Sequence, residues 1–138
     1  MRTVLLTVGR AKAPFAEADA HYRRLLGRLQ PVEVVEARDE DALVKRLPER
    51  GRVAAVDPRG RAMDSHEWAG WLEQRRLDAQ DLWLLVGGQL GLPAAALDRA
   101  DELISLGPQT LAHQLARIVV LEQLFRAAKI AAGERYHC

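Results

Sequence analysis

The residues best suited to chemistry gather in the last third of the 138-residue sequence. A glycine-rich stretch, Gly87-Gly88-Gln89-Leu90-Gly91, follows the apolar run Leu82–Val86, and Gly107-Pro108 follows the apolar run Leu103–Leu106. Glycine lets the backbone approach a ligand without a Cβ in the way. The same residues would also serve a tight turn between a strand and a helix. A ligand site and plain turns are therefore both open interpretations.

The four histidines are the groups that could move protons or bind metals. No two of them have helical metal-ligand spacing, so we expect no zinc site or other metal. His21 and His66 fall on helical stretches and are expected to face solvent. His113 stands just before a predicted helix and could cap it, pack against it or contact a ligand. His137 follows Tyr136 in a tail that either docks to close a site or only packs.

A long helix predicted from Gln114 to Ala132 carries two arginines of interest. Arg126 follows Glu122 by four residues and can pair with it along the helix. Arg117 lies nine positions before Arg126, so the two side chains cover adjoining faces. In so apolar a helix each arginine is expected to have a specific partner, a carboxylate or an anion such as phosphate. The apolar residues form more than one stripe, so two faces should be buried, one of which could meet a second copy of the chain.

The elements that position these residues alternate between strands and helices. Strands are expected at 3–8, 32–35, 52–56, 82–86 and 103–106, and helices at 15–29, 39–47, 65–77, 93–99 and 114–132. Asp57-Pro58-Arg59-Gly60 has strong turn chemistry, and Asp64-Ser65-His66-Glu67 has the pattern of a capping box. The alternation predicts an α/β fold with a mostly parallel sheet, in one domain over residues 1–138.

In a parallel sheet, ligands bind beyond the carboxyl ends of the strands. Three loops fall at such ends in this sequence, after Val56, after Val86 and after Leu106. The chain lacks a G-x-G-x-x-G fingerprint after its first strand and has no G-x-x-x-x-G-K-[ST] motif. Neither a standard dinucleotide-binding fold nor a P-loop enzyme is therefore supported.

Composition narrows the classes of function further. Lys and Arg number 20 and Asp and Glu 19, a net charge of +1 that neither indicates nor excludes a nucleic-acid binder. The one cysteine is Cys138, so no internal disulfide can form. No stretch is long and apolar enough for a signal peptide or a membrane helix. We therefore expect a cytoplasmic protein with no membrane partner.

Several stretches of the sequence resemble a known family. LLVGGQLGL, ISLGPQTLAHQLARIVVLEQLFRAAKIAAG, the terminal YHC, VAAVDPRGRAMDSHEWAGWL and the opening RTVLLTVGRAK are similar to segments of the RlmH family. Its members are SPOUT-class methyltransferases that act on a pseudouridine of bacterial large-subunit (23S) ribosomal RNA. The similarity covers nearly the whole chain and implies a SPOUT-type parallel sheet flanked by helices, a C-terminal trefoil knot and a homodimer. Pattern rules alone would exclude the knot, because knots are nearly absent elsewhere.

The resemblance also implies roles for individual residues. S-adenosylmethionine would be the cofactor, the ribosome or its large-subunit RNA the partner, and N3 of a pseudouridine the methyl acceptor. Arg126, Tyr136 and His137 match positions that the family uses on the RNA and in catalysis, and His113 and Arg117 are further expected RNA contacts. The residues expected to hold the cofactor are those of the three strand-end loops: Val56, Gly87, Gly88, Leu106, Gly107, Pro108, Gln109, Thr110 and Leu111.

The expected catalytic roles follow from the chemistry of the acceptor. The imide nitrogen must lose its proton before or during methyl transfer, and a neutral histidine can accept a proton near pH 7. His137 is the first candidate base and His113 the second. Arg126 could stabilise the negative charge of the base or hold a phosphate, and Tyr136 could orient the base. A chain this small and nearly neutral has little surface for naked RNA, so we expect an assembled ribosome or subunit as substrate.

Departures from the family pattern keep other functions open. Where the family commonly has G-G-P-E-G, this chain has Gln89-Leu90 in the middle and lacks the acidic residue. Ala112-His113 replaces a Pro-His pair, and Arg135 stands where a proline is expected before Tyr136. The alternatives are a non-catalytic protein that keeps the cofactor or a nucleotide as a ligand, and a SPOUT methyltransferase with another RNA or protein target.

Overall fold

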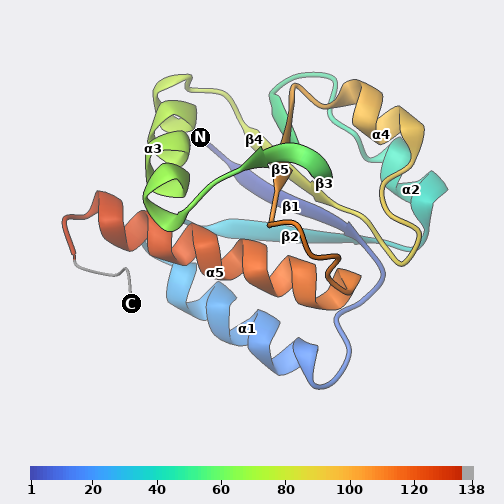
Figure 1. Ribbon diagram of the computed structural model, residues 1–138, viewed down its shortest axis with the longest axis horizontal. Helices are drawn as coiled ribbons and strands as arrows, with labels where there is room; N and C mark the ends of the chain where they lie inside the picture. Colours follow the sequence, from blue (N-terminus) through green and yellow to red (C-terminus); the bar gives the residue numbers. More distant parts are fainter. Residues whose placement is uncertain (135–138) are drawn as a thin grey trace.

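The computed structural model describes residues 1–134, in which strands and helices alternate along the chain (Figure 1). The strands are β1 (Thr3–Val8), β2 (Val32–Ala37), β3 (Arg52–Ala62), β4 (Leu82–Val86) and β5 (Glu102–Ser105). The helices are α1 (Phe15–Leu26), α2 (Glu40–Lys45), α3 (Ser65–Leu77), α4 (Ala94–Arg99) and α5 (His113–Ala131). The order of elements predicted from the sequence is confirmed.

All five strands form one parallel sheet in the order β2-β1-β4-β3-β5. β1 lies inside it, with Leu5 opposite Val34 of β2 on one side and Leu84 of β4 on the other. Because every strand pair is parallel, the carboxyl ends of the strands lie along the same edge. The predicted α/β class with a parallel sheet is confirmed.

Helices cover both faces of the sheet (Figure 1). Neighbouring side chains on β1 point to opposite faces, so Leu5 packs in the core beneath α1, α3 and α5, whereas Leu6 packs in the core beneath α2 and α4. Both leucines are fully buried. A strand buried on both faces reads as a continuous apolar run, which is how Val4-Leu5-Leu6 appears in the sequence.

Helix α5 lies across one face of the sheet, with α1 on one side and α3 on the other (Figure 1). Its buried residues point in several directions, as the breadth of its apolar pattern predicted: Ala116, Arg117, Ile118, Val120, Leu121, Leu124, Phe125, Ala127 and Ala128. The neighbouring helix α3 contributes Trp68 and Trp71, whose rings pack edge to face with their centroids 5.6 Å apart. Most of the broad apolar surface of α5 is therefore covered within the chain, and Leu115 is an exposed exception.

The ends of two helices show how local chemistry sets the boundaries. The predicted capping box at the start of α3 is present, since Glu67 N donates to Asp64 Oδ1 at 2.8 Å and Asp64 N donates to Glu67 Oε1 at 3.1 Å. Helix α1 ends at Leu26, three residues before the predicted end at Leu29. The chain turns there because Gln30 is buried and donates to Thr3 Oγ1 at 2.7 Å, which draws it toward the sheet.

The third strand differs from its prediction. A turn was expected after Val56, but β3 continues through an irregular stretch to Ala62, and Val56 and Arg61 both pair with Ile104 of β5. The backbone of the 57–60 stretch lies against β5, since a Cβ on Gly60 would be only 2.4 Å from the carbonyl carbon of Leu103. Pairing with β5 therefore prevails over the turn propensity of these residues.

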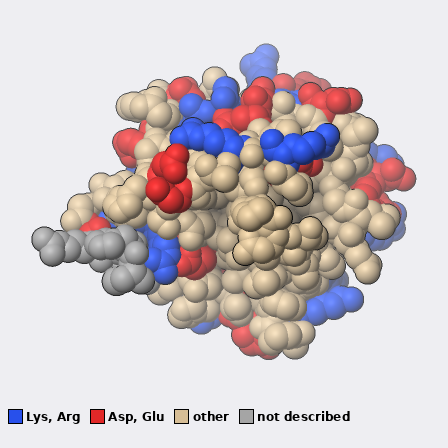
Figure 2. Space-filling model, viewed as in Figure 1, with Lys and Arg blue, Asp and Glu red and all other residues tan. Residues whose placement is uncertain are grey.

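The surface mixes charges of both signs. On the face seen in Figure 2, charged groups crowd the upper edge, and the middle of the face carries uncharged side chains. Within residues 1–134, no helix is long and apolar enough to cross a membrane.

Candidate functional site

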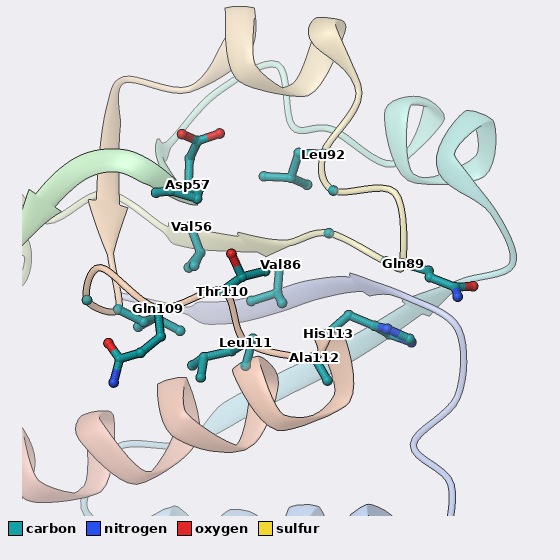
Figure 3. Close-up of a pocket in the computed structure, with 17 residues that line it drawn as sticks. Val56, Asp57, Val86, Gln89, Leu92, Gln109, Thr110, Leu111, Ala112 and His113 are labelled. Atoms are coloured by element: carbon teal, nitrogen blue, oxygen red, sulfur yellow. The ribbon is translucent and has the colours of Figure 1, made fainter.

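A cavity of about 520 Å³ opens at the carboxyl edge of the sheet (Figure 3). Its volume lies in the range of about 300–1,000 Å³ that is usual for small-molecule sites. Three stretches of the chain line it: residues 56–58 in the irregular part of β3, residues 86–92 from the end of β4 onward, and residues 106–116 after β5. The lining residues are Val56, Asp57, Pro58, Val86, Gly87, Gly88, Gln89, Gly91, Leu92, Leu106, Gly107, Gln109, Thr110, Leu111, Ala112, His113 and Ala116.

The structure brings most of the predicted site residues to this cavity. Every residue expected to hold the cofactor lines it except Pro108. His113, the first residue of α5, is also in the wall, whereas Arg117 and Arg126 are not. Tyr136 and His137 lie outside the described residues.

The glycine stretch after β4 folds back on itself at the cavity. Gly91 N donates to Gly88 O at 3.0 Å, and the two residues form an isolated bridge. A Cβ on Gly87 would lie 2.4 Å from the carbonyl carbon of Gly91, so no larger residue fits without moving the loop. The tight turn alone accounts for this glycine, and the same turn forms one wall of the cavity.

The stretch after β5 forms a second wall. Gly107 has a φ of +123°, which side chains rarely tolerate, and Ser105 Oγ accepts its N–H at 3.1 Å. In Figure 3 the Thr110 hydroxyl points toward Val56 and Leu111 lies near Val86, whereas the Gln109 amide points away from them. Thr110 can therefore offer a side-chain hydrogen bond inside the cavity.

Asp57 is a wall residue that the sequence analysis did not select. The side chain of Arg59 donates to its carboxylate from Nε at 2.9 Å, and this hydrogen bond lowers the pKa of Asp57 despite partial burial. The carboxylate is therefore ionised at neutral pH. A signal was available, because Asp57 directly follows Val56, and an Asp-x-Arg spacing allows this local pair.

The remaining wall is largely apolar, and Val56, Val86 and Leu92 line much of it. Backbone groups of the two glycine-containing loops, Thr110 and His113 add polar groups. Such a site suits a ligand with a flat or apolar part and polar ends. Among the described residues, no group of three or more His, Cys, Asp or Glu side chains could hold a metal ion.

Arg117 lies beneath the loop that follows β1 and is only 2% exposed. Its guanidinium donates to Asp19 Oδ2 at 2.9 Å and to Glu36 Oε2 at 2.9 Å. Of the two partners expected for it, a carboxylate or an anion, the structure has the carboxylate. Its placement lends no support to the RNA contact expected of this residue.

Glu36, the second partner of Arg117, is itself perturbed. Burial raises its pKa, but the N–H of Ala11 and the guanidinium of Arg117 outweigh burial, so the net pKa of Glu36 is lowered. Farther along α5, Arg126 pairs with Glu122, as their spacing predicted.

Comparisons with known proteins agree with one another. A family model described as "Predicted SPOUT methyltransferase" matches residues 1–137. Proteins named ribosomal RNA large subunit methyltransferase H are similar over nearly their full length. The one from Gemmatimonas aurantiaca is 38% identical and covers 99% of both chains, and that from Gluconacetobacter diazotrophicus is 42% identical, with 96% of this chain and 95% of the relative covered.

Solved structures share the fold at low identity. A probable methyltransferase from Bordetella pertussis matches with a TM-score of 0.60 at 18% identity, covering 92% of this chain and 96% of that one. A putative methyltransferase from Legionella pneumophila, solved with bound SAM, matches with a TM-score of 0.53 at 14% identity, covering 93% and 66%.

Proposed function

The chain belongs to the SPOUT methyltransferase family, and from this premise we propose that it transfers a methyl group from S-adenosylmethionine to large-subunit ribosomal RNA. Relatives over nearly the whole length carry the name ribosomal RNA large subunit methyltransferase H. The acceptor we propose is N3 of a pseudouridine in 23S rRNA, reached on the assembled ribosome or subunit.

One observation carries the proposal: the three strand-end loops meet around a single cavity at the carboxyl edge of the sheet. S-adenosylmethionine combines a flat adenine ring with charged and hydroxyl-bearing ends. The apolar wall around Val86 and Leu92, flanked by backbone polar groups and Thr110, fits such a molecule. The carboxylate of Asp57 in the same wall is paired with Arg59.

In the proposed mechanism, the protein contributes mainly by positioning. When bound, S-adenosylmethionine supplies an electrophilic methyl group. Val56 and Leu111 would restrict the adenosine part, and the glycine loop from Gly87 to Gly91 would exclude water from one side of it. His113, at the rim, can hydrogen-bond the incoming base or accept its proton.

We assign the other catalytic roles to three residues by their match to the family. His137 is the first candidate for the base that removes the imide proton, Tyr136 orients the pseudouridine, and Arg126 stabilises its negative charge or holds a phosphate. If His137→Ala kept wild-type turnover with unchanged cofactor binding, the base would be another group, with His113 next in order.

The proposal also includes a knot, an oligomeric state, a domain organisation and a cellular location. We infer a trefoil knot at the C-terminal part from the match to the family, and the close approach of the 57–60 stretch to β5 is compatible with it. We also infer a homodimer, and the partly exposed Leu25 on α1 and Leu115 on α5 are compatible apolar contacts. Residues 1–138 would form one domain, and a ribosomal substrate would place it in the cytoplasm.

Calorimetry with S-adenosylmethionine, together with the mass in solution, is the first test. We expect a dimer that binds in the micromolar range. Methyl transfer is then measured on ribosomal subunits that lack the modification and, in parallel, on the same RNA free of protein. Transfer to neither substrate by a protein that binds the cofactor would favour a non-catalytic protein or another target. Equal transfer to both would contradict the requirement for an assembled subunit.

A further inference from the structure

The loop between β1 and α1, residues 9–14, is held by its backbone. Ala11 N donates to Glu36 Oε2 at 2.9 Å, Lys12 N donates to Gln114 Oε1 at 2.9 Å, and Gln114 Nε2 donates to Arg10 O at 2.9 Å. Gly9 N adds a bond to Ala37 O at 2.7 Å. The loop is therefore fixed without using its own side chains.

The 9–14 loop lies beside the wall of the cavity. Gln114, which holds the loop, directly follows the wall residue His113. Val8, just before the loop, contacts the glycine stretch, since a Cβ on Gly88 would be 3.0 Å from Val8 Cγ1. Figure 1 shows the chain leaving β1 and passing beside the start of α5 on its way to α1.

The two basic side chains of this loop are available for an external partner. Arg10 and Lys12 are exposed, and within residues 1–134 neither has an ion pair. The nearby carboxylate of Glu36 is already neutralised by Arg117 and the N–H of Ala11. Glu40 is the carboxylate near the glycine stretch on the other flank, at the start of α2. Arg10 and Lys12 therefore place positive charge on the α5 side of the cavity.

We infer that Arg10 and Lys12 bind the phosphate backbone of the RNA strand whose base enters the cavity, an inference that rests on the proposed function. Phosphate contacts fix the position of a nucleic acid, whereas base contacts specify it. A loop whose backbone is already ordered loses little entropy on binding, so its two charges can fix the strand at small cost. A base can be held in the cavity only if the flanking backbone crosses this side of the cavity.

The test measures binding of unmodified large ribosomal subunits across a range of salt concentrations. Arg10→Ala/Lys12→Ala should bind about tenfold more weakly near physiological salt, and the slope of log affinity against log salt should become shallower by about 1.4, as expected for two lost phosphate contacts to a single strand. Arg10→Lys/Lys12→Arg should keep most of the affinity. The affinity for S-adenosylmethionine should not change in either variant.

Arg46→Ala/Arg50→Ala is the matched control, because both arginines are exposed and lie on the segment that leads from the end of α2 to the amino end of β3. Wild-type affinity of the Arg10/Lys12 alanine variant, or an equal loss in the control, would overturn the inference. So would a loss of cofactor affinity, since the loop would then hold the cofactor carboxylate. Wild-type protein that binds subunits with the expected salt dependence but transfers no methyl group would refute the proposed function and leave the inference standing.

Discussion

The two edges of the parallel sheet, where the strands begin and where they end, have different kinds of contact. At the amino edge, charged side chains link strands that are far apart in sequence. At the carboxyl edge, glycine-containing loops and uncharged side chains surround a cavity. Both edges belong to the same five strands, so the difference lies in the segments that enter and leave them.

Glu102, the first residue of β5, is the centre of the amino edge. Its carboxylate accepts from Arg52 at the start of β3, from Arg75 at 2.8 Å and from the indole N–H of Trp71 on α3. Asp101 adds a bond from the N–H of Val53 at 2.8 Å. These contacts hold together helix α3 and the starts of β3 and β5. The residues that line the cavity take no part in them.

The carboxyl edge has an ion-pair network beneath the 9–14 loop, where Arg117 meets Asp19 and Glu36. The cavity itself has Asp57 as its charged carboxylate. If the cavity binds the cofactor as proposed, the Glu102 contacts at the amino edge and the ligand site lie at opposite edges of the sheet, and the following three predictions test this separation.

The largest effect is expected for Gly87→Ala. The added Cβ would collide with the backbone of Gly91, so the loop must open, and we expect cofactor affinity to fall by about 100-fold, or roughly 2.7 kcal/mol. Calorimetry with S-adenosylmethionine measures it. Gly70→Ala in α3 is the control, since nothing lies within 4 Å of its Cβ position and helix propensity predicts a gain in stability of about 0.5–1 kcal/mol. Unchanged affinity of the Gly87 variant would remove the loop from the binding site.

An intermediate effect is expected for Glu102→Gln at the amino edge. Two arginines lose their shared carboxylate, and we expect the free energy of unfolding in urea to fall by about 1–3 kcal/mol. The exposed Glu73→Gln on α3 is the control and should change little. Cofactor affinity of the folded Glu102 variant should stay at the wild-type value. A parallel loss of affinity would show that the two edges are coupled.

The smallest effect is expected on the free energy of unfolding at acidic pH. The pKa of Glu36 is lowered in the folded state from an ordinary value of 4.5, so its contribution to stability is present above that value and is lost as pH falls through the folded pKa. Glu36→Gln should therefore give a flatter fall in unfolding free energy below about pH 4.5 than the wild type. Glu33 lies on β2 with Glu36 and forms an exposed ion pair with Arg2, so Glu33→Gln is the control and should follow the wild-type curve. Coincident curves for the Glu36 variant and the wild type would contradict the role of this pair.

Local chemistry made much of the fold predictable. The strand at 82–86 and the capping box at Asp64 are where the sequence predicted them, because apolar runs and helix caps act over a few residues. The extension of β3 was missed because the Asp57–Gly60 stretch has turn chemistry of its own. Its pairing with Ile104 depends on a segment more than forty positions away, which no local pattern reveals.

The location of the candidate site could be predicted from the sequence, but not all the residues of the cavity wall. The rule that ligands bind beyond the carboxyl ends of parallel strands brought Val56, Gly87 and Leu106 together correctly as neighbours of one cavity. The partner of Arg117 could not be chosen from the sequence, because Asp19 lies 98 positions away and meets it only through the packing of α1 against α5.

The hydrogen bonds between Gln114 and the 9–14 loop have a consequence for biosynthesis. Residues near the start of the chain are fixed by a helix that is translated last among the described elements, and that same helix contributes His113 and Ala116 to the cavity wall. A domain generally folds as a unit, so this fold is completed only when its last helix has emerged. A nascent chain whose α5 is still inside the ribosome contains all five strands but lacks the complete cavity wall and the Gln114 hydrogen bonds to its first loop, so unfinished copies would be inert toward cofactor and RNA alike.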